Sequence, residues 1–208
     1  MTLQAWDACA HASRTIEQSH CAGASGCHDL FTMSCYRRAH QGNCYFFTVV
    51  TYQRRMILCD DPIRLALHRA INTVRANRPF SIDAWVLLPD HLHCIWTLPV
   101  DDQDYSIRWS RIKGLVVRDC PQYAVQSPQT RKRRRDSTIW QRRFWEHQIR
   151  NDRDFAAHMD YIHYNPVHHG QVTEAVDWPF STLQRLVASG HYPPAWAAAP
   201  AIVDLNFE

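Results

Sequence analysis

Two histidines stand two positions apart, at His91 and His93, within the run LPDHLHCIWTL that covers residues 88–98. In a β-strand the side chains at positions i and i+2 point to the same face of the sheet, so these two imidazoles could bind one metal ion. The spacing alone is weak evidence, because two partly exposed histidines beside a turn are more common than a metal site. A metal centre at this place therefore requires a further ligand from another part of the chain.

The segment from residue 152 onward supplies such candidates on a predicted helix. A cap at Asn151 or Asp152 begins this helix, and the sequence predicts that it ends near Tyr164, ahead of Asn165-Pro166. Polar groups recur at helical spacing along one stripe, at Asp154, His158, Tyr161 and Asn165. The neighbouring stripe is apolar and would pack on a sheet, at Phe155, Met159 and Ile162.

If this helix packs beside the histidine strand, it brings a tyrosine hydroxyl and an amide oxygen to the two imidazoles. Tyr161 would then be available for chemistry, and Asn165 would be a third metal ligand one turn later. Each residue also has a structural interpretation, in which Tyr161 lies at a packing interface and Asn165 caps the end of the helix. The sequence leaves both interpretations open.

The remaining elements follow from periodicity. Strands are predicted at 44–52, 80–88, 91–98 and 138–150, and helices at 61–78 and about 105–120. Strict alternation in the second strand would place Phe80 on the same face as Ala84 and Val86. The order strand, helix, strand, strand, helix, strand, helix predicts an α+β domain, with a ferredoxin-like antiparallel sheet and helices packed mainly on one face.

Composition restricts the class of protein. The chain has 208 residues, 46% of them hydrophobic, which suits one globular domain. It has no apolar run of the roughly 18–20 residues that a membrane span needs, and no secretory signal at its start, so we expect a cytoplasmic protein. None of its eight cysteines forms a CxxC pair, which favours reduced thiols.

The basic residues are almost all arginine. Of 23 basic residues only Lys113 and Lys132 are lysines, and the formal net charge is +3. Arginine binds phosphate through two parallel hydrogen bonds, so this composition is compatible with a nucleic-acid partner without proving one. We expect a flexible extension at 1–34, a catalytic domain at 35–190 and a loosely attached tail at 191–208.

Four segments, in this order, resemble a known family. They are YFFT at 45–48, LPDHLH at 88–93, WQRRFWEH at 140–147 and YIHYNPV at 161–167. Together they resemble the REP-associated tyrosine transposases, which are bacterial HUH nucleases (named for their histidine–hydrophobic–histidine motif) related to the IS200-like single-strand transposases. The resemblance extends over about residues 34–185. It implies the HUH nuclease fold and a metal-dependent single-stranded DNA endonuclease and strand transferase. Such an enzyme cleaves and rejoins DNA at repetitive extragenic palindromic (REP) hairpins through a 5′-phosphotyrosine.

The resemblance also assigns roles to residues. His91 and His93 match the metal-binding histidines, and Asn165 takes the position of the third ligand, which is glutamine in the insertion-sequence relatives. Tyr161 matches the nucleophile because it lies four residues before that ligand, whereas Tyr164 is the rival hydroxyl. Imidazole and oxygen ligands suit Mg²⁺ or Mn²⁺.

Other residues are candidates for supporting roles. Groups that could orient the ligands or carry protons are Glu146, His147 and His158. Candidate phosphate contacts are Arg37, Arg38, Arg142, Arg143 and Arg150. Aromatic residues that could stack on bases, or equally pack in the fold, are Tyr36, Trp140 and Trp145.

We therefore expect a bacterial cytoplasmic enzyme that acts on single-stranded REP-like DNA hairpins, has no membrane partner, and is a monomer rather than a homodimer. Two alternatives belong to other classes. One is a noncatalytic nucleic-acid-binding protein derived from a transposase, although all three ligand positions and the tyrosine are filled. The other is a metal phosphohydrolase that forms no covalent link to DNA.

Overall fold

An antiparallel sheet organises the part of the chain that the computed structural model describes, which is residues 43–125, 139–194 and 196. Its four strands lie in the order β2-β3-β1-β4 and are Ser81–Leu87, His91–Thr97, Cys44–Val50 and Trp145–Gln148. The two inner strands are β3, which pairs with β2 and β1, and β1, which pairs with β3 and β4. The histidine pair therefore lies on an inner strand, where its backbone is fixed on both sides.

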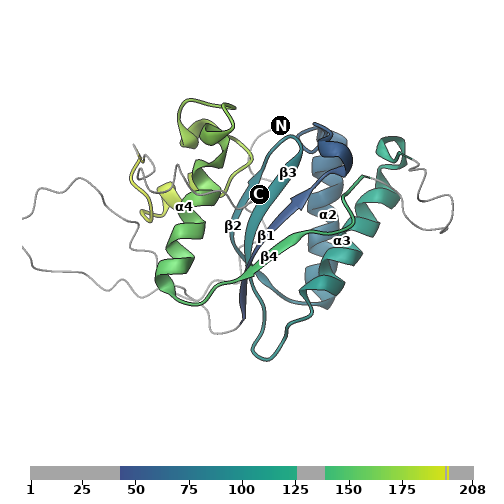
Figure 1. The fold of residues 1–208 in the computed structure, drawn as a ribbon, viewed down its shortest axis with the longest axis horizontal. Coiled ribbons are helices and arrows are strands. Elements are labelled where there is room, and N and C mark those ends of the chain that lie inside the picture. The colour runs from purple at the N-terminus through teal and green to yellow at the C-terminus, as the bar shows by residue number, and fades with distance from the viewer. Residues whose placement is uncertain (1–42, 126–138, 195, 197–208) are drawn as a thin grey trace, which may run out of the picture.

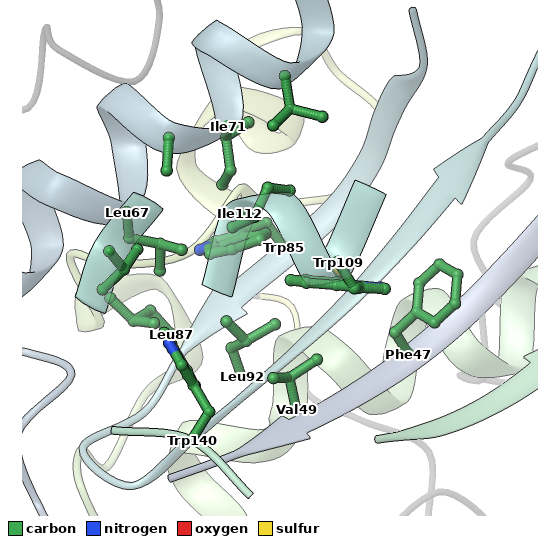
Figure 2. Close-up of a cluster of buried hydrophobic side chains, with 14 of the residues drawn as sticks. Phe47, Val49, Leu67, Ile71, Trp85, Leu87, Leu92, Trp109, Ile112 and Trp140 are labelled. Atoms are coloured by element: carbon green, nitrogen blue, oxygen red, sulfur yellow. The ribbon is translucent and has the colours of Figure 1, made fainter. Parts of the chain in front are cut away.

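Two helices, α2 (Asp61–Asn77) and α3 (Tyr105–Asp119), cover one face of this sheet (Figure 1). Pro62 lies in the first turn of α2, where the backbone N–H groups have no partner within the helix. The predicted apolar stripe of this helix is buried, at Ile63, Leu67, Ala70, Ile71 and Val74. Tryptophans fill the space beneath (Figure 2), and the Trp96 and Trp109 rings stack at 4.2 Å between centroids.

The third long helix, α4 (Asp152–His168), lies on the opposite side of the sheet from α2 and α3 (Figure 1). Its apolar stripe of Phe155, Met159 and Ile162 packs with Phe46 and Ile95 in a second hydrophobic cluster. Because helices cover both faces, all seven residues of β3 are buried. The predicted α+β class with an antiparallel sheet is confirmed.

Two predictions about strands are wrong in detail. A β-bulge between Ile82 and Ala84 reverses the alternation of β2, so Phe80 joins the cluster under α2 and α3 while Ala84 faces α4. The strand predicted at 138–150 is reduced to Trp145–Gln148, with one isolated bridge between Trp140 and Thr51. Short edge strands of this kind are common because only one neighbour holds them.

The remaining described elements are short. They are η1 (Tyr52–Arg54), η2 (Pro121–Tyr123), η4 (Ala175–Asp177) and α5 (Leu183–Ala188). After α5 the chain returns to α4, where the buried Tyr192 donates a 2.7 Å hydrogen bond to Asp160. The predicted extension at 1–34 lies outside the described residues, as does most of the tail at 191–208. Among the described helices, none combines the length and apolar character that a membrane crossing requires.

Candidate active site

The two histidines of β3 point toward α4, as the period of two predicts. His91 and His93 are both buried, and their ring centroids are 4.8 Å apart. They share this face with Ile95, which belongs to the cluster under α4, whereas Leu92 and Cys94 belong to the cluster under α2 and α3. Two imidazoles therefore meet on the side of the sheet that carries the predicted tyrosine.

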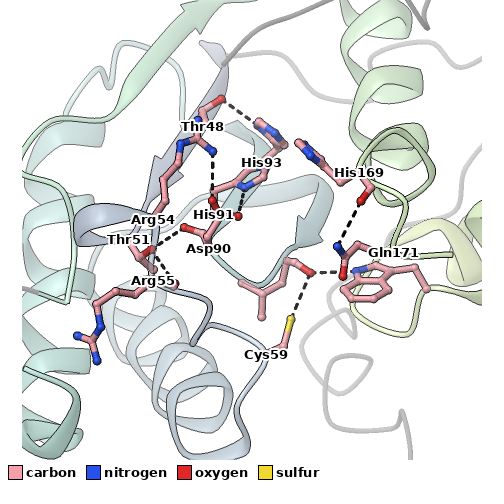
Figure 3. A network of polar contacts seen from close by, with 12 residues as sticks. Thr48, Thr51, Arg54, Arg55, Cys59, Asp90, His91, His93, His169 and Gln171 are labelled. Carbon is pink, nitrogen blue, oxygen red and sulfur yellow. Dashed lines mark hydrogen bonds and ion pairs between the residues drawn. The ribbon is translucent and has the colours of Figure 1, made fainter.

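A carboxylate and an arginine orient His91 (Figure 3). The Nδ1 atom of His91 lies 2.6 Å from Asp90 Oδ1, and Arg54 Nη1 donates to Asp90 Oδ2 at 3.1 Å. A carboxylate only accepts hydrogen bonds, so this contact places the proton on Nδ1 and the lone pair on Nε2. Hydrogen bonding of one imidazole nitrogen to a carboxylate is the usual way in which proteins orient a metal-binding histidine.

A hydroxyl group fixes the second ring. Thr48 lies opposite His93 in the β1–β3 register, and its Oγ1 is 2.8 Å from His93 Nδ1. Among the described residues, the buried Nε2 atom of His93 has no hydrogen-bond partner. A buried polar atom without a partner is costly unless a ligand satisfies it.

The surroundings shift the pKa values of His93 and of Asp90, the carboxylate behind His91. Burial lowers the pKa of His93 well below its usual range, and the neighbouring charges of His91 and His169 lower it further, so the ring is neutral. Burial alone would raise the pKa of Asp90, but hydrogen bonds and charges from His91 and Arg54 outweigh it and lower that pKa. A neutral His93 ring and an ionised carboxylate behind His91 are both compatible with metal binding.

The helix that carries the tyrosine is longer than the sequence predicts. It begins where the Asn151 side chain accepts a hydrogen bond from Asp154 N at 2.9 Å, and it continues through Pro166 to His168. The prediction that it ends before Asn165-Pro166 is therefore wrong. Proline disfavours a helical conformation in the residue before it but does not exclude one. Because Pro166 has no N–H, one carbonyl of the preceding turn lacks its helical donor. Only a short stretch of helix follows Pro166, so this carbonyl lies close to the helix end.

Because the helix continues, Asn165 keeps the alignment expected from its spacing. Tyr161 lies one turn before Asn165, and its ring centroid is 5.2 Å from the ring centroid of His93. His169 lies one turn after Asn165, and its ring centroid is 5.0 Å from the ring centroid of His91. Asn165 thus lies between two residues that contact the histidine pair. Its amide is buried, and neither its oxygen nor its nitrogen has a hydrogen-bond partner in the described part of the chain.

The two tyrosines of α4 differ in their surroundings. Tyr161 is buried and packs edge-on against His93 and against Phe46, the latter at 6.0 Å. Tyr164 is half-buried at the border of the cluster under α4. Of these two tyrosines, Tyr161 is therefore the one whose ring packs against the histidine pair.

The other candidates fall into separate places. Arg142, Arg143 and Arg150 are exposed beside β4, and Arg37 and Arg38, like Tyr36, lie outside the described residues. Trp145 is 42% exposed on the α4 side, where it contacts Phe46 at 5.6 Å, whereas Trp140 is buried in the core under α2 and α3.

The three groups suggested for orientation or proton transfer do not lie together. Glu146 lies opposite Phe47 in the β1–β4 register and therefore on the side of α2 and α3. There, burial raises the pKa of Tyr105, and the charge of Glu146 raises it further. His147 and His158 lie on the α4 side, both within hydrogen-bonding distance of Asp154.

Sequence reasoning missed four residues of the site. They are Thr48, Arg54, Asp90 and His169. Asp90 stands directly before the histidine motif, and His169 lies eight residues after Tyr161, so spacing could have indicated both. Arg54 follows from no sequence signal, because it reaches Asp90 from a left-handed backbone conformation with φ of 50°.

A cavity of about 240 Å³ opens beside His91. Arg54 and Asp90 line it from the sheet side, and His169 and Gln171 line it from the end of α4. The cavity therefore lies beside His91, and its lining carries a guanidinium, a carboxylate and neutral hydrogen-bonding groups.

Comparison with known proteins yields consistent matches. Residues 40–165 match the family model described as "Transposase IS200 like". The chain is 47% identical to the REP-associated tyrosine transposase of Escherichia coli K12 over 79% of its own length and 92% of that protein. It is 42% identical to the putative REP-associated tyrosine transposase of Haemophilus influenzae Rd over 81% of its length and 96% of that protein. A solved structure described as a REP-associated tyrosine transposase bound to a REP hairpin is 45% identical, with a TM-score of 0.65, and the match covers 79% of this chain and 91% of that one.

Proposed function

Since this chain belongs to the IS200-like transposases, and within them to the REP-associated tyrosine transposases, we propose that it cleaves and rejoins single-stranded DNA at REP hairpins through Tyr161. The observation that carries the proposal is the contact between one tyrosine of α4 and the histidine pair of β3. The Tyr161 ring is 5.2 Å from that of His93, and the unpartnered Asn165 amide follows one turn later.

A divalent ion fits these residues. His91, His93 and Asn165 would hold it, because two oriented imidazoles and one buried amide oxygen form a nitrogen–oxygen donor set that suits Mn²⁺ or Mg²⁺. When bound, the ion would neutralise the negative charge that develops on the scissile phosphate. The buried atoms of His93 and Asn165 without hydrogen-bond partners are the structural support for this assignment.

Tyr161 would perform the covalent step. Its hydroxyl oxygen attacks the phosphorus, a tyrosine–phosphate bond forms, and the bond to the 3′ oxygen breaks, which leaves a 5′-phosphotyrosine and a free 3′-OH. The new ester resembles the old one in energy, so a 3′-OH can attack it in turn and rejoin the DNA without ATP. The rings of His93 and Phe46 confine the Tyr161 ring, which limits the positions its hydroxyl can take.

Several exposed groups near the site suit single-stranded DNA. Trp145 offers an exposed ring on the α4 side, on which a base could stack. Arg142, Arg143 and Arg150 flank β4 and would contact phosphates. The cavity between Arg54 and His169 would receive a nucleotide next to the cleaved bond.

A labelled hairpin tests the proposal. The protein is incubated with Mn²⁺ and a REP hairpin in single-stranded DNA labelled on the 3′ side of the cleavage site, and a label-bearing protein band is expected on a denaturing gel. Tyr161→Phe should abolish the band, while the matched variant Tyr164→Phe should keep it. A band that persists in Tyr161→Phe would overturn the assignment, and cleavage without any adduct would point to a hydrolase.

The setting of this activity belongs to the same proposal. The relatives named above are bacterial proteins, and chromosomal hairpins would be reached in the bacterial cytoplasm. We expect the chain to act as a monomer. Sedimentation velocity at micromolar concentration should give one species of about 24.3 kDa, and a stable dimer would contradict this expectation.

A further inference from the structure

A second cluster of potential metal ligands lies on the α4 side of the sheet, beside the site described above. His147 comes from β4, and Asp154 and His158 come from the first turns of α4. Their donor atoms all lie within 4.8 Å of one another. We propose that these three side chains form a second metal site, for a transition ion such as Zn²⁺, which joins β4 to the helix that carries Tyr161.

The distances are close to those that a bound ion requires. With metal–ligand bonds of 2.0–2.1 Å, the donors of a tetrahedral zinc site lie about 3.4 Å apart. The Asp154 carboxylate is already 2.9 Å from His147 Nε2 and 3.1 Å from His158 Nδ1. His158 Nδ1 also donates a 2.8 Å hydrogen bond to the Asp154 carbonyl oxygen, and the ring gives up this bond if it binds the ion through Nδ1. The two imidazoles must reorient, because their rings are stacked, 4.7 Å apart at an angle of 12°, and the lone pairs of stacked rings do not converge on one point. His147 is the ring that would turn, because 24% of its side chain is exposed.

The surrounding structure holds the three groups in place. Asp154 Oδ2 accepts a hydrogen bond from Arg150 N at 2.9 Å, which orients the carboxylate. The His158 ring packs against Phe46 at 4.8 Å, and the His147 ring stacks on Trp145 at 6.0 Å. Ligands restrained in this way lose little conformational freedom when they bind an ion.

Capping of α4 does not explain the cluster. Asn151 already caps the helix through Asp154 N, and the return hydrogen bond from Arg150 N needs only the carboxylate. In addition to these bonds, His147 of β4 contacts the same carboxylate, and His158 Nδ1 lies 3.1 Å from it beside the Asp154 carbonyl oxygen. One carboxylate with two imidazoles is a common ligand set for Zn²⁺.

The proposed site is separate from the histidine pair of β3 and has a different chemistry. The Phe46 ring contacts both His158, at 4.8 Å, and His93, at 5.5 Å. His147 and Asp154 keep 24% and 20% of their side-chain surface exposed, so water can complete the coordination. Asp154 lies seven residues before Tyr161 on the same helix, so an ion at this point would restrain the position of the proposed nucleophile relative to the sheet.

Metal stoichiometry tests the proposal without any measurement of cleavage. Protein without a polyhistidine tag is freed of metal and titrated with Zn²⁺ by calorimetry, and with Co²⁺ by visible absorption. Wild type should bind two ions, and His147→Gln should bind one. His93→Ala should also bind one, and the double variant none. His68→Ala, which removes a histidine of α2 far from both places, is the matched control and should bind two.

Thermal stability gives a second, independent measurement. In the His93→Ala background, saturating Zn²⁺ should raise the melting temperature by several degrees, because an ion that binds only the folded state stabilises it. The rise should vanish when His147→Gln is added. Equal stoichiometry in wild type and His147→Gln, or an unchanged Zn²⁺ effect on melting in the double variant, would overturn the second site. Either result leaves the role of Tyr161 untouched, which the labelled hairpin tests separately.

Discussion

Replacement of Asp90 by asparagine changes the charge behind a proposed metal ligand with little change of shape. The Asp90 side chain is 13% exposed and lies 2.6 Å from His91 Nδ1 and 3.1 Å from Arg54 Nη1. The asparagine oxygen can still accept a hydrogen bond from Nδ1, so the ring should stay in place. Without the negative charge, the imidazole becomes a weaker donor to an ion at Nε2.

The size of this effect follows from the type of hydrogen bond that is lost. Hydrogen bonds to charged groups contribute about 1.5–3 kcal/mol and those between neutral groups about 0.5–1.5 kcal/mol. The loss of the charge should therefore cost about 1–1.5 kcal/mol. At 1.36 kcal/mol per factor of ten, this is about a tenfold loss of metal affinity. It lies at the lower end of the roughly 10–100-fold losses seen when a residue behind a metal ligand is changed.

The assay is Mn²⁺ dependence of cleavage on the labelled hairpin, together with direct Mn²⁺ binding by electron paramagnetic resonance. Asp90→Asn should need about tenfold more Mn²⁺ for half-maximal cleavage and should recover most of its activity at saturation. Asp104→Asn, which changes an exposed carboxylate paired with Arg78, is the matched control. An unchanged Mn²⁺ requirement in Asp90→Asn would refute the argument that this carboxylate supports a metal-bound His91.

Other predictions concern the third ligand, the base platform and the fold. Asn165→Ala should reduce Mn²⁺ affinity by at least about tenfold while leaving hairpin binding intact, and equal Mn²⁺ binding would exclude Asn165 as a ligand. Trp145→Ala should weaken single-stranded DNA binding by about 1–3 kcal/mol in a fluorescence anisotropy titration, whereas Trp140→Ala should instead lower the melting temperature. Asp102→Asn should lower the free energy of unfolding by about 2 kcal/mol at pH 7, because it removes the bidentate partner of the buried Arg108. The Arg108 hydrogen bond lowers the pKa of Asp102, so this stabilisation is present above about pH 4 and is lost as the pH falls through the lowered pKa. Urea unfolding at pH 7 and pH 3 should therefore show the difference between Asp102→Asn and wild type shrinking at the lower pH, and a constant difference would contradict this assignment.

Local periodicity predicted the parts of the site that lie on single elements. The two-residue repeat of β3 placed His91 and His93 on one face, and the helical stripe of α4 placed Tyr161 and Asn165 on another. Both predictions depend only on the geometry of one strand or one helix. For the same reason the buried stripe of α2 was predicted correctly.

Contacts between elements could not be predicted in this way. Thr48 meets His93 only because of the β1–β3 register, and His147 meets Asp154 only because of the turn that the chain makes between β4 and α4. A pattern of period two is the same for several registers, so it does not select one. The helix end was misplaced for a related reason, because the preference before proline is weaker than the packing of α4, and His169 was therefore not considered.

Mass spectrometry of the trapped covalent adduct tests the central assignment most directly. Protein that has reacted with the hairpin and Mn²⁺ is digested with trypsin and nuclease, and the nucleotide-bearing peptide is fragmented to locate the modified side chain. We predict a 5′-phosphotyrosine on Tyr161, within the peptide that also contains Tyr164 and Asn165. A nucleotide on Tyr164, or cleaved DNA without any modified tyrosine, would contradict the account.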